Sequence, residues 1–362
     1  MSRSFLTEIT ASVSLLLSLT SCGASTTTPT TVTVDPRIEL MGIVQYLDGY
    51  MLSTKYEFNY KTEVEEYFGE FREHEAVTIF HHMAAGGFTF DAVPKTMLTL
   101  TDPPDLESNY DFPADVVALA GGEESLETFV AAMRDFAIQT DFISFFNGHR
   151  SLYDSLTTEA TPTMVAAVDA LEEYLGDTLS GAHVILGVLL HHGGFSTLFE
   201  THRSREAFVV IGPAGGNGTY PGFGAARRLG SIAWHEFAHT VVNDLTAKNR
   251  DWLDANLHRY ETVAEDLGRY GYGTWETVVN EHIVRAINAR MLLRHLGPAV
   301  GRSAVITDES RGFVYLASLV NALSRYETSR DKYAGLRDFY PELLEAFVEE
   351  TPADTTVMDG EG

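Results

Sequence analysis

Two histidines and a glutamate inside an otherwise uncharged stretch constrain the fold of this chain more than any other feature. His235, Glu236 and His239 lie between Ser231 and Val242, and every other residue of that stretch is uncharged. A spacing of four residues places both imidazoles on one face of a helix, one turn apart. Because burying unpaired polar groups costs free energy, the fold has to bring these side chains a shared partner. We therefore expect a long helix from about residue 229, packed in the interior.

The pattern His-Glu-x-x-His is typical of a zinc site. Two neutral imidazoles and one carboxylate suit one zinc ion (Zn2+) per chain, with a fourth position open to water. We expect His235 and His239 to hold the metal, while Glu236 reaches the water and acts as its general base. The chain has a single cysteine, Cys22, so His, Asp and Glu must supply the metal ligands of the folded part. The alternative is a helix with hydrogen-bonded core histidines.

A third ligand is expected from a second helix, over residues 274–286, with Thr274 as its N-cap. At about 100° per residue, one apolar stripe of this helix faces the core. The stripe consists of Val279, Ile283 and Ala286. Glu281 lies nearly opposite that stripe and can face a cleft while the helix stays packed. We therefore predict Glu281 as the third ligand, with Glu276 and His282 as the alternatives.

A glycine-rich loop, from Gly212 to Gly224, precedes the predicted metal helix and is expected to line the substrate groove. Its Tyr220 is the predicted catalytic donor of a hydrogen bond to the oxyanion of a tetrahedral intermediate. Tyr272 and His258 are equal alternatives for that role.

The N-terminus has the pattern of a lipoprotein signal peptide over residues 1–21. A short apolar stretch, too short to span a bilayer, ends in Leu19-Thr20-Ser21-Cys22. Cys22 is therefore the predicted lipidation site, and the alternative is an ordinary secretory signal with an incidental cysteine. Residues 22–37 are rich in Thr and Pro and predict a flexible linker. We expect an exported protein, anchored by lipid to the outer face of the cytoplasmic membrane or to the outer membrane.

Composition limits the partners of the chain. The formal net charge is −26 over 362 residues, and such an acidic surface repels phosphate backbones, so nucleic-acid binding is not expected. The expected partners are a peptide or protein substrate and the membrane, and the sequence leaves the oligomeric state open.

The pattern of apolar residues predicts an α+β, mostly helical fold for residues 38–350. Residues 38–180 read as helices that wrap a metal-site part over residues 181–350. Short apolar runs at 183–190 and 207–211 predict a small sheet beside the metal helix. His191-His192 at the end of the first run is interpreted as a loop pair, because adjacent strand residues point to opposite faces. Residues 351–362 lack apolar periodicity and predict a disordered tail.

The motifs resemble those of known metallopeptidases. A His-Glu-x-x-His helix followed by a helix with Asn280-Glu281 is similar to the gluzincins, whose third ligand is a downstream glutamate. More closely, the chain resembles a bacterial family of exported proteins known as a domain of unknown function and regarded as metallopeptidases. The resemblance covers most of residues 38–350. The matching stretches are Tyr67-Phe68 to His74-Glu75-Ala76-Val77, Phe90-Asp91-Ala92-Val93, His235 to His239 with Asn243, Asn280-Glu281-His282 with Val284-Arg285-Ala286, and Phe339-Tyr340-Pro341.

This resemblance implies a zincin-like fold and one zinc ion. In thermolysin-like enzymes an acid follows the glutamate ligand by one turn, whereas this chain has Arg285 there, which is available to clamp Glu281. The function we expect is a zinc-dependent hydrolase, in particular a peptidase. The alternatives are a surface lipoprotein that binds zinc or a partner without turnover, and a cell-wall amide hydrolase. Glu236 argues against the binder, because a purely structural site has no use for a base beside an open metal position.

Overall fold

A computed structural model describes residues 30–50, 55–179, 181–200, 205–216 and 218–348, and the fold over these residues is mostly helical with a small mixed sheet. The predicted signal peptide, Cys22 and the predicted tail lie outside the described residues. Among the described helices, none is long and apolar enough to cross a membrane.

Four strands form the main sheet, in the order β1-β2-β4-β3. Their bounds are β1 Thr31–Thr33, β2 Ala182–Leu186, β3 Gly194–Glu200 and β4 Arg205–Ile211. β2 pairs in parallel with both β1 and β4, whereas β3 runs antiparallel to β4 and forms one edge of the sheet. The predicted strand at 207–211 is confirmed, whereas the one at 183–190 ends at Leu186 and continues as a buried turn.

The predicted linker over residues 22–37 is wrong at its C-terminal end. Residues 31–33 form β1, with Val32 opposite Val184, and the first helix already begins at Pro36. β-branched side chains favour strands, and Thr31-Val32-Thr33 can pair with the open edge of β2. The fold thus begins before residue 38.

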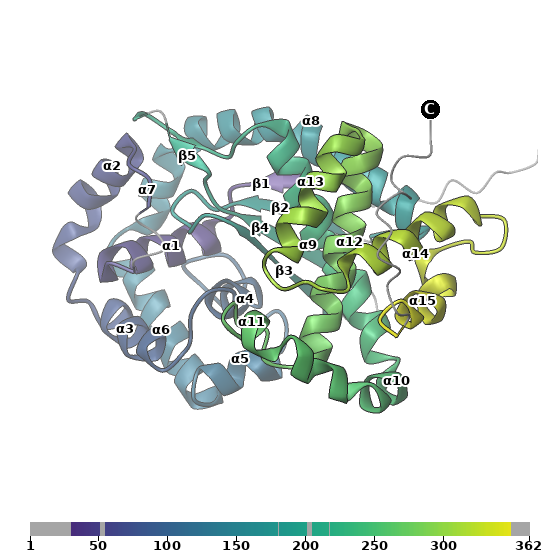
Figure 1. The fold of residues 1–362 in the computed structure, drawn as a ribbon. Helices are drawn as coiled ribbons and strands as arrows, with labels where there is room; N and C mark the ends of the chain where they lie inside the picture. Colours follow the sequence, from purple (N-terminus) through teal and green to yellow (C-terminus); the bar gives the residue numbers. More distant parts are fainter. Residues whose placement is uncertain (1–29, 51–54, 180, 201–204, 217, 349–362) are drawn as a thin grey trace, which may run out of the picture.

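The first half of the chain contributes helices that lie to one side of the sheet. Their bounds are α1 Pro36–Asp48, α2 Asn59–Phe68, η1 Gly69–Phe71, α3 Glu75–Ala85, α4 Ala92–Leu98, α5 Ala114–Leu119, α6 Glu123–Gln139, α7 Phe142–Gly148 and α8 Arg150–Leu175. Figure 1 shows α1, α2, α3, α6 and α7 to the left of the sheet. α8 contacts β1, β2 and α9, and the buried residues of both halves form one hydrophobic core.

The second half carries the helices of the site. Their bounds are α9 Ala226–Ala247, α10 Arg250–Ala255, η2 Leu257–Thr262, α11 Ala264–Gly268, α12 Trp275–Leu296, α13 Pro298–Glu309, α14 Leu316–Thr328 and α15 Leu336–Glu345, preceded by the short strands β5 Gly215–Gly216 and β6 Pro221–Gly222. α9 packs against β3, β4, α8 and α12 (Figure 1). The side chain of Thr274 accepts a hydrogen bond from the backbone N–H of Thr277, as the predicted N-cap of α12 requires.

Candidate metal centre

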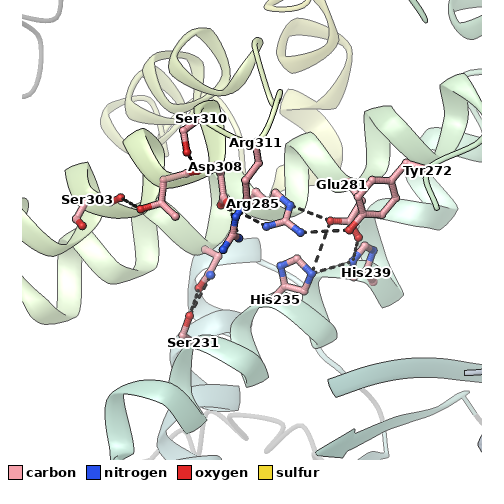
Figure 2. A network of polar contacts seen from close by, with 12 residues as sticks. Ser231, His235, His239, Tyr272, Glu281, Arg285, Ser303, Asp308, Ser310 and Arg311 are labelled. Carbon is pink, nitrogen blue, oxygen red and sulfur yellow. Dashed lines mark hydrogen bonds and ion pairs between the residues drawn. The ribbon is translucent and has the colours of Figure 1, made fainter. Parts of the chain in front are cut away.

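The packing of α9 against α12 brings His235, His239 and Glu281 together (Figure 2). Their ligand atoms all lie within 4.8 Å of one another. Nε2 of His239 is 3.3 Å from Nε2 of His235 and 3.2 Å from Oε1 of Glu281. Nε2 of His235 is 3.9 Å from Oε2 of Glu281. Two helices far apart in sequence thus supply three donor atoms to one point.

The donor set fits a zinc ion. Tetrahedral coordination with bonds of 2.0–2.1 Å separates neighbouring ligand atoms by about 3.3–3.4 Å. The His–His and His239–Glu281 separations of 3.3 and 3.2 Å match this spacing, and the third separation, 3.9 Å, is about half an ångström longer. Two imidazoles and one carboxylate are also the ligand types that zinc accepts when one position stays open.

Asn243, one turn after His239, orients that imidazole. Nδ1 of His239 lies 3.2 Å from the amide oxygen of Asn243, so the Nδ1 proton donates there and Nε2 keeps its lone pair towards the site. Burial opposes protonation of His239, but the hydrogen bond and charge of Glu281 raise its pKa. Burial lowers the pKa of His235 to about 3. The carboxylate of Glu281 therefore favours positive charge at this point, which a metal ion would supply.

Arg285 holds the ligand carboxylate from the other side, as expected from its position one turn after Glu281. Its Nε donates to Oε2 of Glu281 at 3.0 Å, and its two other nitrogens donate to Asp308 at 3.0 Å and to the Tyr272 oxygen at 3.2 Å (Figure 2). The ring of Phe313 stacks 4.2 Å from the guanidinium carbon. Burial alone would raise the pKa of Glu281, but His239, His235 and Arg285 together hold it below its usual range.

Glu236 lies beside the triad without belonging to it. It lines the same cavity, and burial raises its pKa to about 7, opposed by the nearby His239 and by a hydrogen bond with Ser196. Gly194, the first residue of β3, lies close to the side chain of Glu236. A Cβ on Gly194 would lie 2.9 Å from Cγ2 of Ile232 and 3.3 Å from Oε1 of Glu236. Only glycine allows the strand to approach this closely.

Two cavities meet at the triad. One, of about 460 Å³, lies on the side of His239, Glu281 and Tyr272. The other, of about 830 Å³, extends along α9, α12 and α13. Both are lined by Gly194, His235, Glu236 and Arg285, so a ligand can approach the triad from two sides.

Comparison with known proteins identifies the family. A sequence profile described as Domain of unknown function (DUF4932) matches residues 30–346. The chain belongs to the DUF4932 family. Its first matched residue precedes β1, which agrees with a fold that begins before residue 38. No curated protein and no solved structure matches this DUF4932 chain.

The two alternatives to Glu281 as third ligand of this DUF4932 protein, Glu276 and His282, make other contacts. The carboxylate of Glu276 forms an ion pair with Arg250 at 2.9 Å. His282 is fully buried, donates from Nδ1 to the carbonyl oxygen of Val278 at 2.8 Å, and is surrounded by the rings of Phe313, Tyr315 and Phe347. Of the three candidates, the fold brings Glu281 to the histidine pair.

The position of Tyr220 contradicts its predicted role as oxyanion donor. β5 and β6 pair as a hairpin, and Tyr220 in its turn lines a separate cavity with Ser151 and Leu152 of α8. The loop therefore leads away from the triad, which its glycines alone could not reveal. His258 is exposed on η2. Tyr272, the remaining alternative, lines the triad cavity, and burial raises the pKa of its hydroxyl to about 12, with the Glu281 charge adding to the shift.

Several residues of this cavity were not predicted from the sequence. His191 lines it instead of serving only as a loop residue, and its Nε2 is buried without a hydrogen-bond partner among the described residues. Phe90, which lies just before α4, and Lys95 within that helix form another wall of the cavity. Phe90-Asp91 belongs to a stretch that carried the family resemblance, and that resemblance was the one signal pointing to this wall.

Proposed function

We propose that this protein is a zinc-dependent hydrolase that cleaves amide bonds, with peptides or proteins as its substrates. The convergence of His235, His239 and Glu281 between two cavities carries the proposal. The zincin-like fold that this function implies is supported by the position of the motif helix α9 against a mixed sheet with an antiparallel edge strand.

Zinc bound by the triad would lower the pKa of a water to about 7 and polarise the carbonyl of the scissile amide. Glu236 takes the proton of the attacking water as the new C–O bond forms, and returns it to the amine nitrogen as the C–N bond breaks. Tyr272 stays protonated at neutral pH and donates to the oxygen on which negative charge develops. Arg285 fixes both Tyr272 and Glu281 through its hydrogen bonds.

The edge strand β3 favours an extended peptide over other amides. Gly194, Phe195 and Ser196 line the triad cavity, and among the described strands β3 pairs only with β4. The backbone groups of its free edge can pair with a substrate chain laid alongside it. A substrate held in this way places an amide bond beside Glu236.

We further propose that the protein is exported and lipid-anchored through Cys22. This rests on the sequence pattern around Leu19-Thr20-Ser21-Cys22.

The test compares two variants of the triad region with a matched control. Glu236→Gln should keep zinc and lose activity by roughly two to four orders of magnitude, because it removes the base and preserves shape. His239→Ala should lose both zinc and activity. Glu276→Gln, the same change at an acid paired with Arg250 outside the triad, should keep both.

The measurements are bound zinc per chain and cleavage of a peptide and amide library across roughly pH 6–9, around the expected pKa of about 7. If the wild-type chain holds one zinc and cleaves nothing, the better interpretation is a surface protein that binds zinc or a partner without turnover. Cleavage of cell-wall amides but not peptides would make the enzyme a cell-wall hydrolase.

A further inference from the structure

The larger of the two cavities at the triad is lined by arginine, in a chain whose net charge is −26. We call it the arginine cavity. It lies between the first turns of α9 and the helices α12 and α13, and its arginines are Arg227, Arg228, Arg285 and Arg311. It opens onto His235 and Glu236, so a substrate held at the triad extends into it.

The charges of this cavity are not balanced. Its carboxylates are Glu236 and Asp308, and Asp308 is already shared by Arg285 at 3.0 Å and Arg311 at 3.1 Å. Arg228 donates to the carbonyl oxygens of Phe223 and Gly212, which are neutral. Arg227 is exposed and forms no ion pair with any described residue. Two guanidinium groups, those of Arg227 and Arg228, therefore line the cavity without a carboxylate partner among the described residues.

Folding alone does not account for this placement. Arg227 and Arg228 occupy the first turn of α9, which contains no acidic residue. The positive end of a helix dipole disfavours cations there. Ser303 and Thr307 of α13 add hydroxyl groups to the lining, beside apolar residues such as Ile232 and Val300. A ligand anion would satisfy both the excess charge and these donors.

We propose that the arginine cavity binds a carboxylate of the substrate, so that cleavage is selective for an amide with a carboxylate group on that side of the scissile bond. The inference rests on the proposed function. The carboxylate belongs either to an acidic side chain or to the C-terminus of the chain being cleaved. The acidic surface does not prevent this, because charges beyond about 8–10 Å are screened by salt, whereas the arginines contact the ligand directly.

The experiment uses the zinc-loaded full chain and pairs of fluorogenic peptides. One pair differs by Glu against Gln at each position flanking the cleaved bond, and a second pair differs by a free against an amidated C-terminus. We expect kcat/KM to be about tenfold higher for the carboxylate member of one pair, and the pair that responds identifies the source. Equal kcat/KM within both pairs would overturn the proposal.

Variants test whether the arginines cause the preference. Arg227→Gln should reduce this preference roughly three- to fivefold, which is the scale of one exposed charge contact. Arg227→Glu should reverse the preference, so that a peptide with Lys in place of Glu at the same position is cleaved faster. Arg269→Gln, the same change at an exposed arginine on α11's C-terminal side, should leave it unchanged. An Arg227→Gln variant that slows both members of the pair equally would contradict a specificity role.

A binding measurement separates this inference from the proposed function. Fluorescence anisotropy with the zinc-loaded Glu236→Gln variant should show tighter binding of the carboxylate peptide, lost in Glu236→Gln/Arg227→Gln. If wild type cleaves no peptide, the proposed function is wrong, and the same binding difference still supports an anion-binding cavity. Cleavage of peptides without any carboxylate preference, in turnover and binding alike, would reject the cavity assignment alone.

Discussion

Replacing Arg285 by Met should weaken both the metal centre and the fold. The change keeps much of the side-chain length and removes the hydrogen bonds to Glu281 at 3.0 Å, Asp308 at 3.0 Å and Tyr272 at 3.2 Å. The side chains of Arg285 and Glu281 are only 18% and 10% exposed, so solvent screens this ion pair weakly. Breaking a buried pair typically costs about 3–5 kcal/mol.

Remaining contacts reduce that figure. Glu281 keeps His239 at 3.2 Å, and Asp308 keeps Arg311 at 3.1 Å, so neither carboxylate is left without a partner. We therefore expect the free energy of unfolding of the metal-free protein to fall by about 2–3 kcal/mol, below the range for a fully orphaned charge. Zinc affinity should fall about 10- to 100-fold, which is the usual effect of removing a group that orients a ligand.

Urea unfolding with a chelator present measures the first quantity, and zinc competition against a chelator of known affinity measures the second. Arg269→Met is the matched control, because Arg269 also pairs with a glutamate four residues earlier, at 2.6 Å, but the two side chains are 65% and 87% exposed. An exposed pair contributes about 0–1 kcal/mol, so the control should change little. If Arg285→Met binds zinc within about threefold of wild type, Arg285 does not orient Glu281.

Three further predictions concern pH, the approach of β3 and the N-terminus. In the metal-free protein burial raises the pKa of Glu236 to about 7, so between about pH 4.5 and 7 the folded state holds more protons than the unfolded state, and stability is lost as pH rises. Glu236→Gln removes the titrating group, so its free energy of unfolding relative to wild type should rise by about 2–3 kcal/mol between pH 5 and 7.5, measured by urea unfolding. If the difference between variant and wild type stays constant over this pH range, the prediction is wrong. Gly194→Ala should displace Glu236 and lower kcat/KM about tenfold or more, while Gly268→Ala, where no atom lies within 4 Å of the added Cβ, should not. Cys22→Ser should release the protein from membranes into the soluble exported fraction, and unchanged membrane association would reject lipidation.

The parts of the site that could be predicted depend on local geometry. His235 and His239 share a face because a helix turns by a fixed angle per residue, and the same angle singled out Glu281 on the next helix. Thr274 as N-cap is equally local. Arg285 followed from its position one turn after Glu281, as soon as both were on one helix.

The parts of the site that could not be predicted depend on where the loops between secondary-structure elements run in the folded chain. Tyr220 precedes the metal helix by few residues, yet the β5–β6 pairing carries it towards α8. Conversely, His191 reaches the triad cavity because the chain turns between β2 and β3, which no periodicity encodes. β3 itself alternates between less and more buried positions, the pattern of a half-buried edge strand, so this strand was within reach of sequence reasoning.

Phe90 indicates that the N-terminal helices serve the site and not only the core. Its backbone φ is 50°, which is unfavourable for a bulky residue by about 1–2 kcal/mol, and its ring is 57% exposed beside the triad cavity. Neither feature stabilises the fold. The hydroxyl of Tyr50 nevertheless accepts a hydrogen bond from the Phe90 N–H, and the Phe90 ring lies edge-on to His191 at 6.1 Å. Because strain of this kind persists only where surrounding contacts impose it and gathers at binding sites, the proposed function would assign Phe90, just before α4, to the surface that contacts the substrate.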